Sequence, residues 1–137
     1  MANTKGQIFG INGPVVKVKG SDSFEMQEMV YVGNEELIGE VIGVTSDTTI
    51  VQVYEETTGL KKGEPVVGTG GPLSITLAPG ILSDIFDGIE RPLKEIRNMS
   101  GSFIGRGLKV TNLDERKTWN VEMVAKQGDY VTGGDII

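Results

Sequence analysis

Two residue types are missing from this sequence: its 137 residues include neither cysteine nor histidine. Without thiols, no disulfide and no thiolate metal site can form. Without imidazole, there is no Ser-His-Asp or Cys-His nucleophile system and no ordinary zinc or iron site. Most hydrolytic mechanisms are therefore excluded, and any catalysis would rest on carboxylates, lysine or arginine.

Long apolar runs and an excess of positive charge are also missing. No run approaches the roughly 20 apolar residues that a membrane helix needs, and Met1 to Gly6 lack the apolar stretch of a secretory signal. These features predict a soluble, cytoplasmic protein. The net charge of −6 would repel a phosphate backbone, so nucleic acid is not expected as a partner.

Glycine, by contrast, is abundant, and most stretches between the glycines alternate apolar and polar side chains with the period of two that is typical of β-strands. The strand-like stretches are 8–11, 16–19, 29–32, 38–44, 50–54 and 73–77. In 38–44 we place Ile38, Ile42 and Val44 on one face. Six or seven short strands favour a small closed barrel, which leaves no exposed sheet edge. We therefore expect an all-β fold with a barrel domain over residues 1–78.

Two glycine clusters, at 68–72 and 105–107, could suggest a phosphate-binding loop. A P-loop needs a Gly-Lys pair, which this chain does not contain, and the second cluster lacks the third glycine of a dinucleotide-binding motif. We therefore expect turns at both clusters.

Residues 79–97 are expected to be a linker that contains one short helix. Ile81, Ile85 and Ile89 recur at helical intervals, and Arg91-Pro92 is interpreted as the end of that helix. Residues 98–137 return to a β-like pattern.

Two groups of acidic residues could be taken for catalytic carboxylates or metal ligands. Glu55 and Glu56 are adjacent on a strand, so their side chains point to opposite faces, and we expect both to be solvated. Asp84, Asp87 and Glu90 have the spacing of a solvated helix face, which we favour over a site for a hard cation. We therefore assign no catalytic, cofactor-binding or metal-binding residue.

The stretch 98–137 is expected to be an incomplete second β unit, similar to a barrel-sandwich. Its only tryptophan, Trp119, is expected in a core more than in an interface. The apolar ending at Ile136-Ile137 favours a chain cut inside this domain, because natural ends are usually solvated. Large side chains such as Phe103 and Met123 would then have too few partners.

Three stretches, Val51–Val66, Leu73–Leu93 and Phe103–Ile137, resemble the A subunit of V-type and archaeal-type (V/A) rotary ATPases. They are similar, in the family's own order, to its barrel signature, its barrel-to-linker segment and the start of its bulge insertion. The resemblance covers essentially the whole chain.

The resemblance implies a parent subunit that hydrolyses or makes ATP, with magnesium, beside B subunits in an A3B3 ring coupled to proton or sodium transport. The chain ends before the family's P-loop and catalytic glutamate, so it is expected to be inactive alone. The implied role of the barrel is mechanical, in a crown that holds the ring together, peripheral to the membrane. The expected contact residues are Val51, Val53, Tyr54, Glu55, Glu56, Gly63, Glu64 and Pro65.

Two alternative functions stay open. Residues 121–136 resemble half of a biotinyl or lipoyl carrier domain, although Lys126 lies on the wrong side of the Gly-Asp turn to be the modified lysine. The chain could also be a free-standing small-barrel interaction module. An oligonucleotide-binding barrel would need a basic face with stacking aromatics, and only 6% of these residues are aromatic.

Overall fold

The computed structural model describes residues 5–20, 24–82, 84–114 and 116–137, which form six strands, one 3₁₀ helix and one α-helix. The strands are β1 (Lys5–Asn12), β2 (Val15–Lys19), β3 (Glu28–Val32), β4 (Leu37–Val44), β5 (Thr49–Val53) and β6 (Pro65–Pro72). The 3₁₀ helix η1 (Pro79–Ile81) and the α-helix α1 (Leu93–Ser100) follow.

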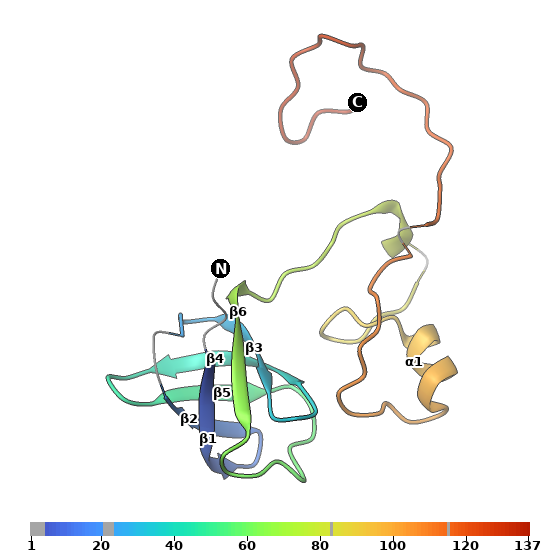
Figure 1. Ribbon diagram of the computed structural model, residues 1–137. Helices are drawn as coiled ribbons and strands as arrows, with labels where there is room; N and C mark the ends of the chain where they lie inside the picture. Colours follow the sequence, from blue (N-terminus) through green and yellow to red (C-terminus); the bar gives the residue numbers. More distant parts are fainter. Residues whose placement is uncertain (1–4, 21–23, 83, 115) are drawn as a thin grey trace.

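The six strands close into one antiparallel barrel in the order β1-β2-β5-β4-β3-β6 (Figure 1). Closure comes from β1, which pairs with β2 on one side and with β6 on the other. Every one of these strands is therefore paired on both sides, as the sequence predicts for a small all-β barrel.

The barrel interior is filled by aliphatic side chains from alternate strand positions. In β2, for example, Val16 and Val18 are 0% and 1% exposed while Lys17 and Lys19 face solvent. Each such side chain contributes about 1.5–3 kcal/mol when it leaves water, so this core is the main source of the barrel's stability. The core residues are Ile8, Val16, Val18, Phe24, Val30, Val32, Leu37, Val41, Val51, Val53 and Val66.

The face of β4 that carries Ile38, Ile42 and Val44 is not its most buried face. Leu37 and Val41 fill the core, whereas Ile42 and Val44 lie on the outer surface, 44% and 42% exposed. Both faces of this strand are apolar, so alternation alone does not say which one points inward. A bulge between Val41 and Gly43 changes the register further along the strand.

The glycine cluster at 68–72 forms the second half of β6, so the prediction of a turn there is wrong. This half pairs with β3, across a bulge between Glu28 and Val30. The Glu28 side chain lies against Gly68, where an added Cβ would collide with its carboxylate. The cluster at 105–107 does form the predicted turn, with Gly107 at φ +61°.

The strand predicted at 73–77 does not form. Ile75 and Leu77 are 57% and 78% exposed, and the chain runs extended away from the barrel. The pairing of β1 with β6 occupies the last sheet edge, so no partner is left for a seventh strand.

The helix predicted over 81–89 is also wrong, because α1 begins only after Pro92. An Asp-Gly turn interrupts the helical spacing: the Asp87 carboxylate accepts hydrogen bonds from the amides of Ile89 and Arg91. Proline lacks an amide hydrogen and is preorganised for a helix start, so Pro92 marks the beginning of α1 where the sequence was interpreted as an end.

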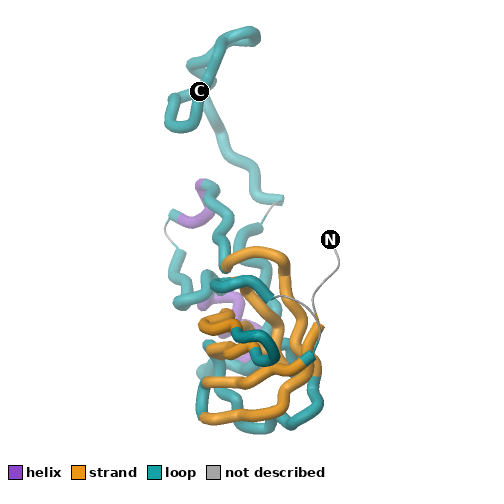
Figure 2. Tube along the Cα trace, turned by 90° about the vertical axis from the view of Figure 1, so that its left-hand side faces the viewer, coloured by secondary structure: helices purple, strands orange, loops and turns teal. Residues whose placement is uncertain are grey.

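After α1, the described residues contain no strand, so the predicted second β unit is not formed in this structure. Figure 2 shows this part as loop, and its final stretch, toward the C-terminus, runs away from the barrel. Phe103 is 84% exposed, Val121 74% and Met123 61%, which agrees with the expectation that large side chains here have few partners.

Candidate functional site: an arginine clasp between the barrel and the following segment

Glu55, which follows β5, contacts two later segments of the chain. Its side chain is only 6% exposed, so the prediction that it is solvated is wrong. Its Oε1 accepts a hydrogen bond from the amide of Ile38 at 3.4 Å. Its Oε2 accepts one from Arg91 Nη1 at 3.1 Å and one from the amide of Gly107 at 3.0 Å.

Arg91 joins Glu55 to Asp87, and we call these three residues the clasp. The Arg91 side chain is 8% exposed, and its Nε donates to Asp87 Oδ2 at 2.7 Å. Asp87 Oδ1 also accepts the Arg91 amide at 2.8 Å, so one carboxylate fixes both the backbone and the side chain of the arginine. The planar guanidinium suits this double recognition, which lysine would not reproduce.

Opposing effects act on the ionisation of the clasp. Burial raises the pKa of the Asp87 carboxyl, but hydrogen bonds from the Arg91 amide, the Arg91 guanidinium and the Ile89 amide outweigh it and lower the pKa overall. Burial also lowers the pKa of Arg91, while the hydrogen bond to Asp87 and the charges of Glu55 and Asp87 raise it overall. Asp87 and Arg91 are therefore both charged at neutral pH.

A second segment, residues 105–109, lies across the same end of the barrel, and we call it the strap. Arg106 donates to the carbonyls of Glu56 and Thr58 and pairs with Glu35 at 3.0 Å. Lys109 pairs with Glu36, in the turn between β3 and β4. The strap and the clasp thus meet on the barrel end formed by the β3–β4 turn and the exit of β5.

Between these segments lies a partly open cavity of about 510 Å³. Its walls come from the β5 exit, from the chain that follows β6, from the clasp and from the strap. They include Tyr54, Glu55, Leu73, Ile89, Arg91 and Ile104. The two arginines at this cavity, Arg91 and Arg106, are both paired with protein carboxylates.

The residues predicted from sequence as contacts of other subunits separate into two sets. Val51 and Val53 have their side chains inside the barrel, and the Glu55 side chain is largely buried in the clasp. Tyr54, Glu56, Gly63 and Pro65 are exposed, and Glu64 is half-buried, with its carboxylate accepting the amide of Asn34. A contact through the exposed set stays a prediction.

The acidic residues at 84, 87 and 90 do not share a solvated face, so that prediction is wrong. Asp84 pairs with Lys94 near the surface, and Asp87 belongs to the clasp. Glu90 is only 9% exposed, and its Oε2 accepts a hydrogen bond from Asn112 at 2.9 Å. Within the part of the chain that the structure describes, no three acidic side chains are grouped as a metal site would require.

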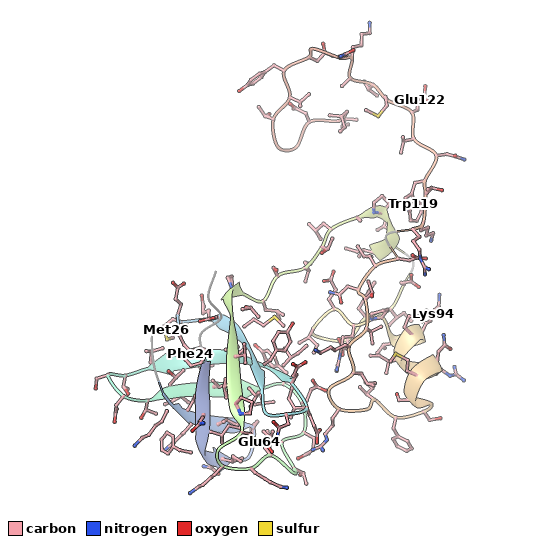
Figure 3. All side chains as sticks on the ribbon, in the orientation of Figure 1. Phe24, Met26, Glu64, Lys94, Trp119 and Glu122 are labelled. Carbon is pink, nitrogen blue, oxygen red and sulfur yellow. The ribbon has the colours of Figure 1, made fainter. Side chains whose placement is uncertain are left out.

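Trp119 is not in a core, which corrects the expectation from sequence. It is 43% exposed, and Lys117 Nζ lies 4.4 Å from the centre of its ring. Figure 3 shows Trp119 well away from the barrel, near η1.

Neither helix in the described part of the chain has the length and apolar character that a membrane-spanning helix requires.

Comparison with known proteins identifies the barrel. Residues 8–70 match the ATP synthase alpha/beta family, beta-barrel domain. The V-type ATP synthase alpha chain 2 of Clostridium tetani is 51% identical over 131 residues, which cover 96% of this chain and 22% of that relative. The A subunit of the A-type ATP synthase of Methanosphaera stadtmanae is 53% identical over 132 residues, covering 96% and 23%.

A third relative, the A subunit of the A-type ATP synthase of Methanopyrus kandleri, is 51% identical over 138 residues, covering 100% of this chain and 23% of the relative. The chain therefore belongs to the ATP synthase alpha/beta family through its β-barrel domain. Within that family, it corresponds over nearly all of its length to the N-terminal region of the A subunit of A/V-type ATP synthases. It spans 22% to 23% of the length of these relatives.

Proposed function

We propose that this chain is a structural and assembly part of the A subunit in an A/V-type ATPase. Its barrel would contact B subunits in an A3B3 ring, and the complex would couple ATP hydrolysis or synthesis to proton or sodium transport, peripheral to the membrane on its cytoplasmic side. The observation that carries the proposal is the identity of 51% to 53% with these relatives across 96% to 100% of the chain.

The lining of the cavity beside the clasp argues against a nucleotide site at that place. The cavity beside the clasp is lined by the carboxylates of Glu55, Glu56 and Asp87, which would repel phosphate groups. The amide of Gly107, which could otherwise face an anion, donates to Glu55. The residues at this cavity do not fit ATP and magnesium, so we derive no catalytic step from them.

The assembly role is tested by sedimentation velocity, which measures the association of this chain with an added B subunit. We expect a complex at about 100 µM, the range of weak contacts. The double variant Tyr54→Lys, Glu56→Lys should weaken it, because both side chains are exposed at the end of β5. Asp47→Lys is the matched control, since it lies in the turn that precedes β5, at the other end of the strand.

A chain that shows no association with B subunits at that concentration would contradict the proposal. A chain that assembles with itself into a stable hexamer would also contradict it, because the proposed ring alternates two different subunits. Equal weakening by the Asp47 control would show that the exposed set at the end of β5 is not the contact.

A further inference from the structure

One atom of the barrel, Glu55 Oε2, holds two segments that are distant in the sequence. It accepts the Arg91 guanidinium of the linker at 3.1 Å and the Gly107 amide of the strap at 3.0 Å. Arg91 and Gly107 lie 36 and 52 positions from Glu55. Among the described residues, Arg91 makes no hydrogen bond to the strap, and the nearest direct link is the one from Asn112, three positions beyond the strap, to Glu90 of the linker. Glu55 is therefore the contact that Arg91 and Gly107 share.

We infer that Glu55 couples the docking of the linker to the docking of the strap, so that each segment binds the barrel more tightly when the other is in place. The reason is the burial of Glu55, at 6% exposure. A carboxylate removed from water needs both a positive partner and hydrogen-bond donors to its oxygens. Arg91 supplies the charge, and Gly107 supplies a donor that is stronger because its acceptor is ionised.

Loss of either segment weakens the contact of the other. If the strap leaves, water reaches Glu55 and screens its attraction to Arg91. If Arg91 leaves, Glu55 becomes an uncompensated buried charge and turns toward solvent, which removes the acceptor of Gly107. Coupling of this kind is reciprocal by thermodynamic necessity.

The two ion pairs of the strap are less able to hold it. The Arg106–Glu35 and Lys109–Glu36 pairs are exposed, and pairs of this kind are worth little in water. The backbone at Gly107 shows how close the approach to the barrel is: φ is +61°, and an added Cβ would lie 2.5 Å from the carbonyl oxygen of Glu35. Only glycine fits this position, so strap docking depends on Gly107 and its bond to Glu55.

The first test replaces Arg91, which does not belong to the strap, and measures amide hydrogen exchange in residues 105–109 of the whole chain. We expect Arg91→Gln to raise strap exchange about tenfold, the size of a typical coupling between sites. Lys94→Gln is the matched control: it removes an exposed ion pair of the same region, with Asp84, and should leave the strap unchanged. The amides of β4 and β5 report whether the barrel is intact.

The second test runs in the opposite direction. Gly107→Ala should raise exchange at the amides of Ile89 and Arg91, which donate their hydrogen bonds to Asp87 and not to the strap. Unchanged strap exchange in an intact Arg91→Gln barrel would overturn the inference. If Arg91→Gln unfolds the barrel, Gly107→Ala decides instead, and unchanged linker exchange in that variant would overturn it.

Discussion

The Glu28 carboxylate and the Gly70 amide, 42 positions apart in the chain, are joined by a hydrogen bond of 2.9 Å where β3 and β6 diverge at a bulge. The other oxygen of Glu28 accepts the amide of Glu25, also at 2.9 Å. Glu28 is 3% exposed, so one buried side chain satisfies two backbone donors at an irregular part of the barrel.

Glu28→Ala should therefore lower the free energy of unfolding by about 1–3 kcal/mol, because it leaves those amides without an acceptor. Urea denaturation followed by circular dichroism measures the change. Glu25→Ala, at an exposed position shortly before β3 begins, is the control and should stay within about 0.5 kcal/mol of the parent chain. Equal stability of both variants would show that Glu28 is not needed at the bulge.

Two glycines of β4 should respond differently to alanine. A Cβ on Gly39 would lie 2.8 Å from the carbonyl oxygen of Gln52 and 2.9 Å from Val51 Cγ1, so the strands must separate. We expect Gly39→Ala to cost about 1–3 kcal/mol of stability in thermal unfolding. A Cβ on Gly43 meets nothing nearer than 3.5 Å, so Gly43→Ala should be nearly neutral. Equal costs would contradict the close approach seen at Gly39.

The clasp should be insensitive to pH until acid conditions are reached. The pKa of Asp87 is lowered in the folded chain, so its stabilising contribution is complete above its ordinary pKa of about 3.9 and is lost as pH falls through the lowered value. The pKa of Arg91 is raised, so its contribution is lost only in strong alkali. Backbone NMR signals of Ile89 and Arg91 should stay constant from about pH 5 to 8.

Below about pH 4 the same signals should move, and Asp87→Asn should abolish that movement. Asp47→Asn, in the exposed turn before β5, is the control and should leave it unchanged. A transition centred near neutral pH would be inconsistent with a lowered pKa of Asp87.

We also expect no measurable binding of ATP by this chain. Its cavity at the clasp is lined by carboxylates, and both of its arginines are already paired. Calorimetric titration with magnesium-ATP should give no saturable heat, whereas a micromolar dissociation constant, about −8 kcal/mol, would contradict the expectation.

The rate of amide hydrogen exchange should differ sharply between the barrel and the C-terminal stretch of the chain. The core strands β4 and β5 are paired on both sides, whereas nearly all residues from 116 to 137 are exposed and outside any strand. We expect slow exchange over 38–54 and fast exchange over 118–137, as for backbone that opens with little cost. Equal protection of the two stretches in dilute solution would show that the second stretch is a complete folded unit.

Patterns within a few residues predicted the barrel, because the inward and outward alternation of a strand is a local property. Val16 and Val18 illustrate this, and so does the run at Val30 and Val32, whose side chains are buried as alternation requires. The second half of β6 could not be predicted in this way, because its glycines have no side chains that could alternate. Glycine is needed at position 68 because the side chain of Glu28, on another strand, lies against it, and the Glu28 carboxylate also accepts the amide of Gly70.

The predictions that are wrong at the candidate site concern residues whose surroundings depend on contacts with residues distant in the sequence. Glu55 and its neighbour Glu56 carry the same charge, yet Glu55 is buried because Arg91 meets it from 36 positions away. No α-helix forms over 81–89 because the Asp87 turn and Pro92 override the hydrophobic spacing of that stretch. Proline can end or begin a helix, and only the fold distinguishes the two.

The position of the clasp also determines where a pulling force would enter the barrel. The chain leaves from the end of β6, at Pro72, where antiparallel pairing with β3 would let tension peel the strand away one hydrogen bond after another. Arg91 instead ties the later chain to Glu55, directly after β5, a strand paired with both β2 and β4. Part of any load that arrives from α1 or beyond would therefore reach β5 through this ion pair instead of acting on β6 alone.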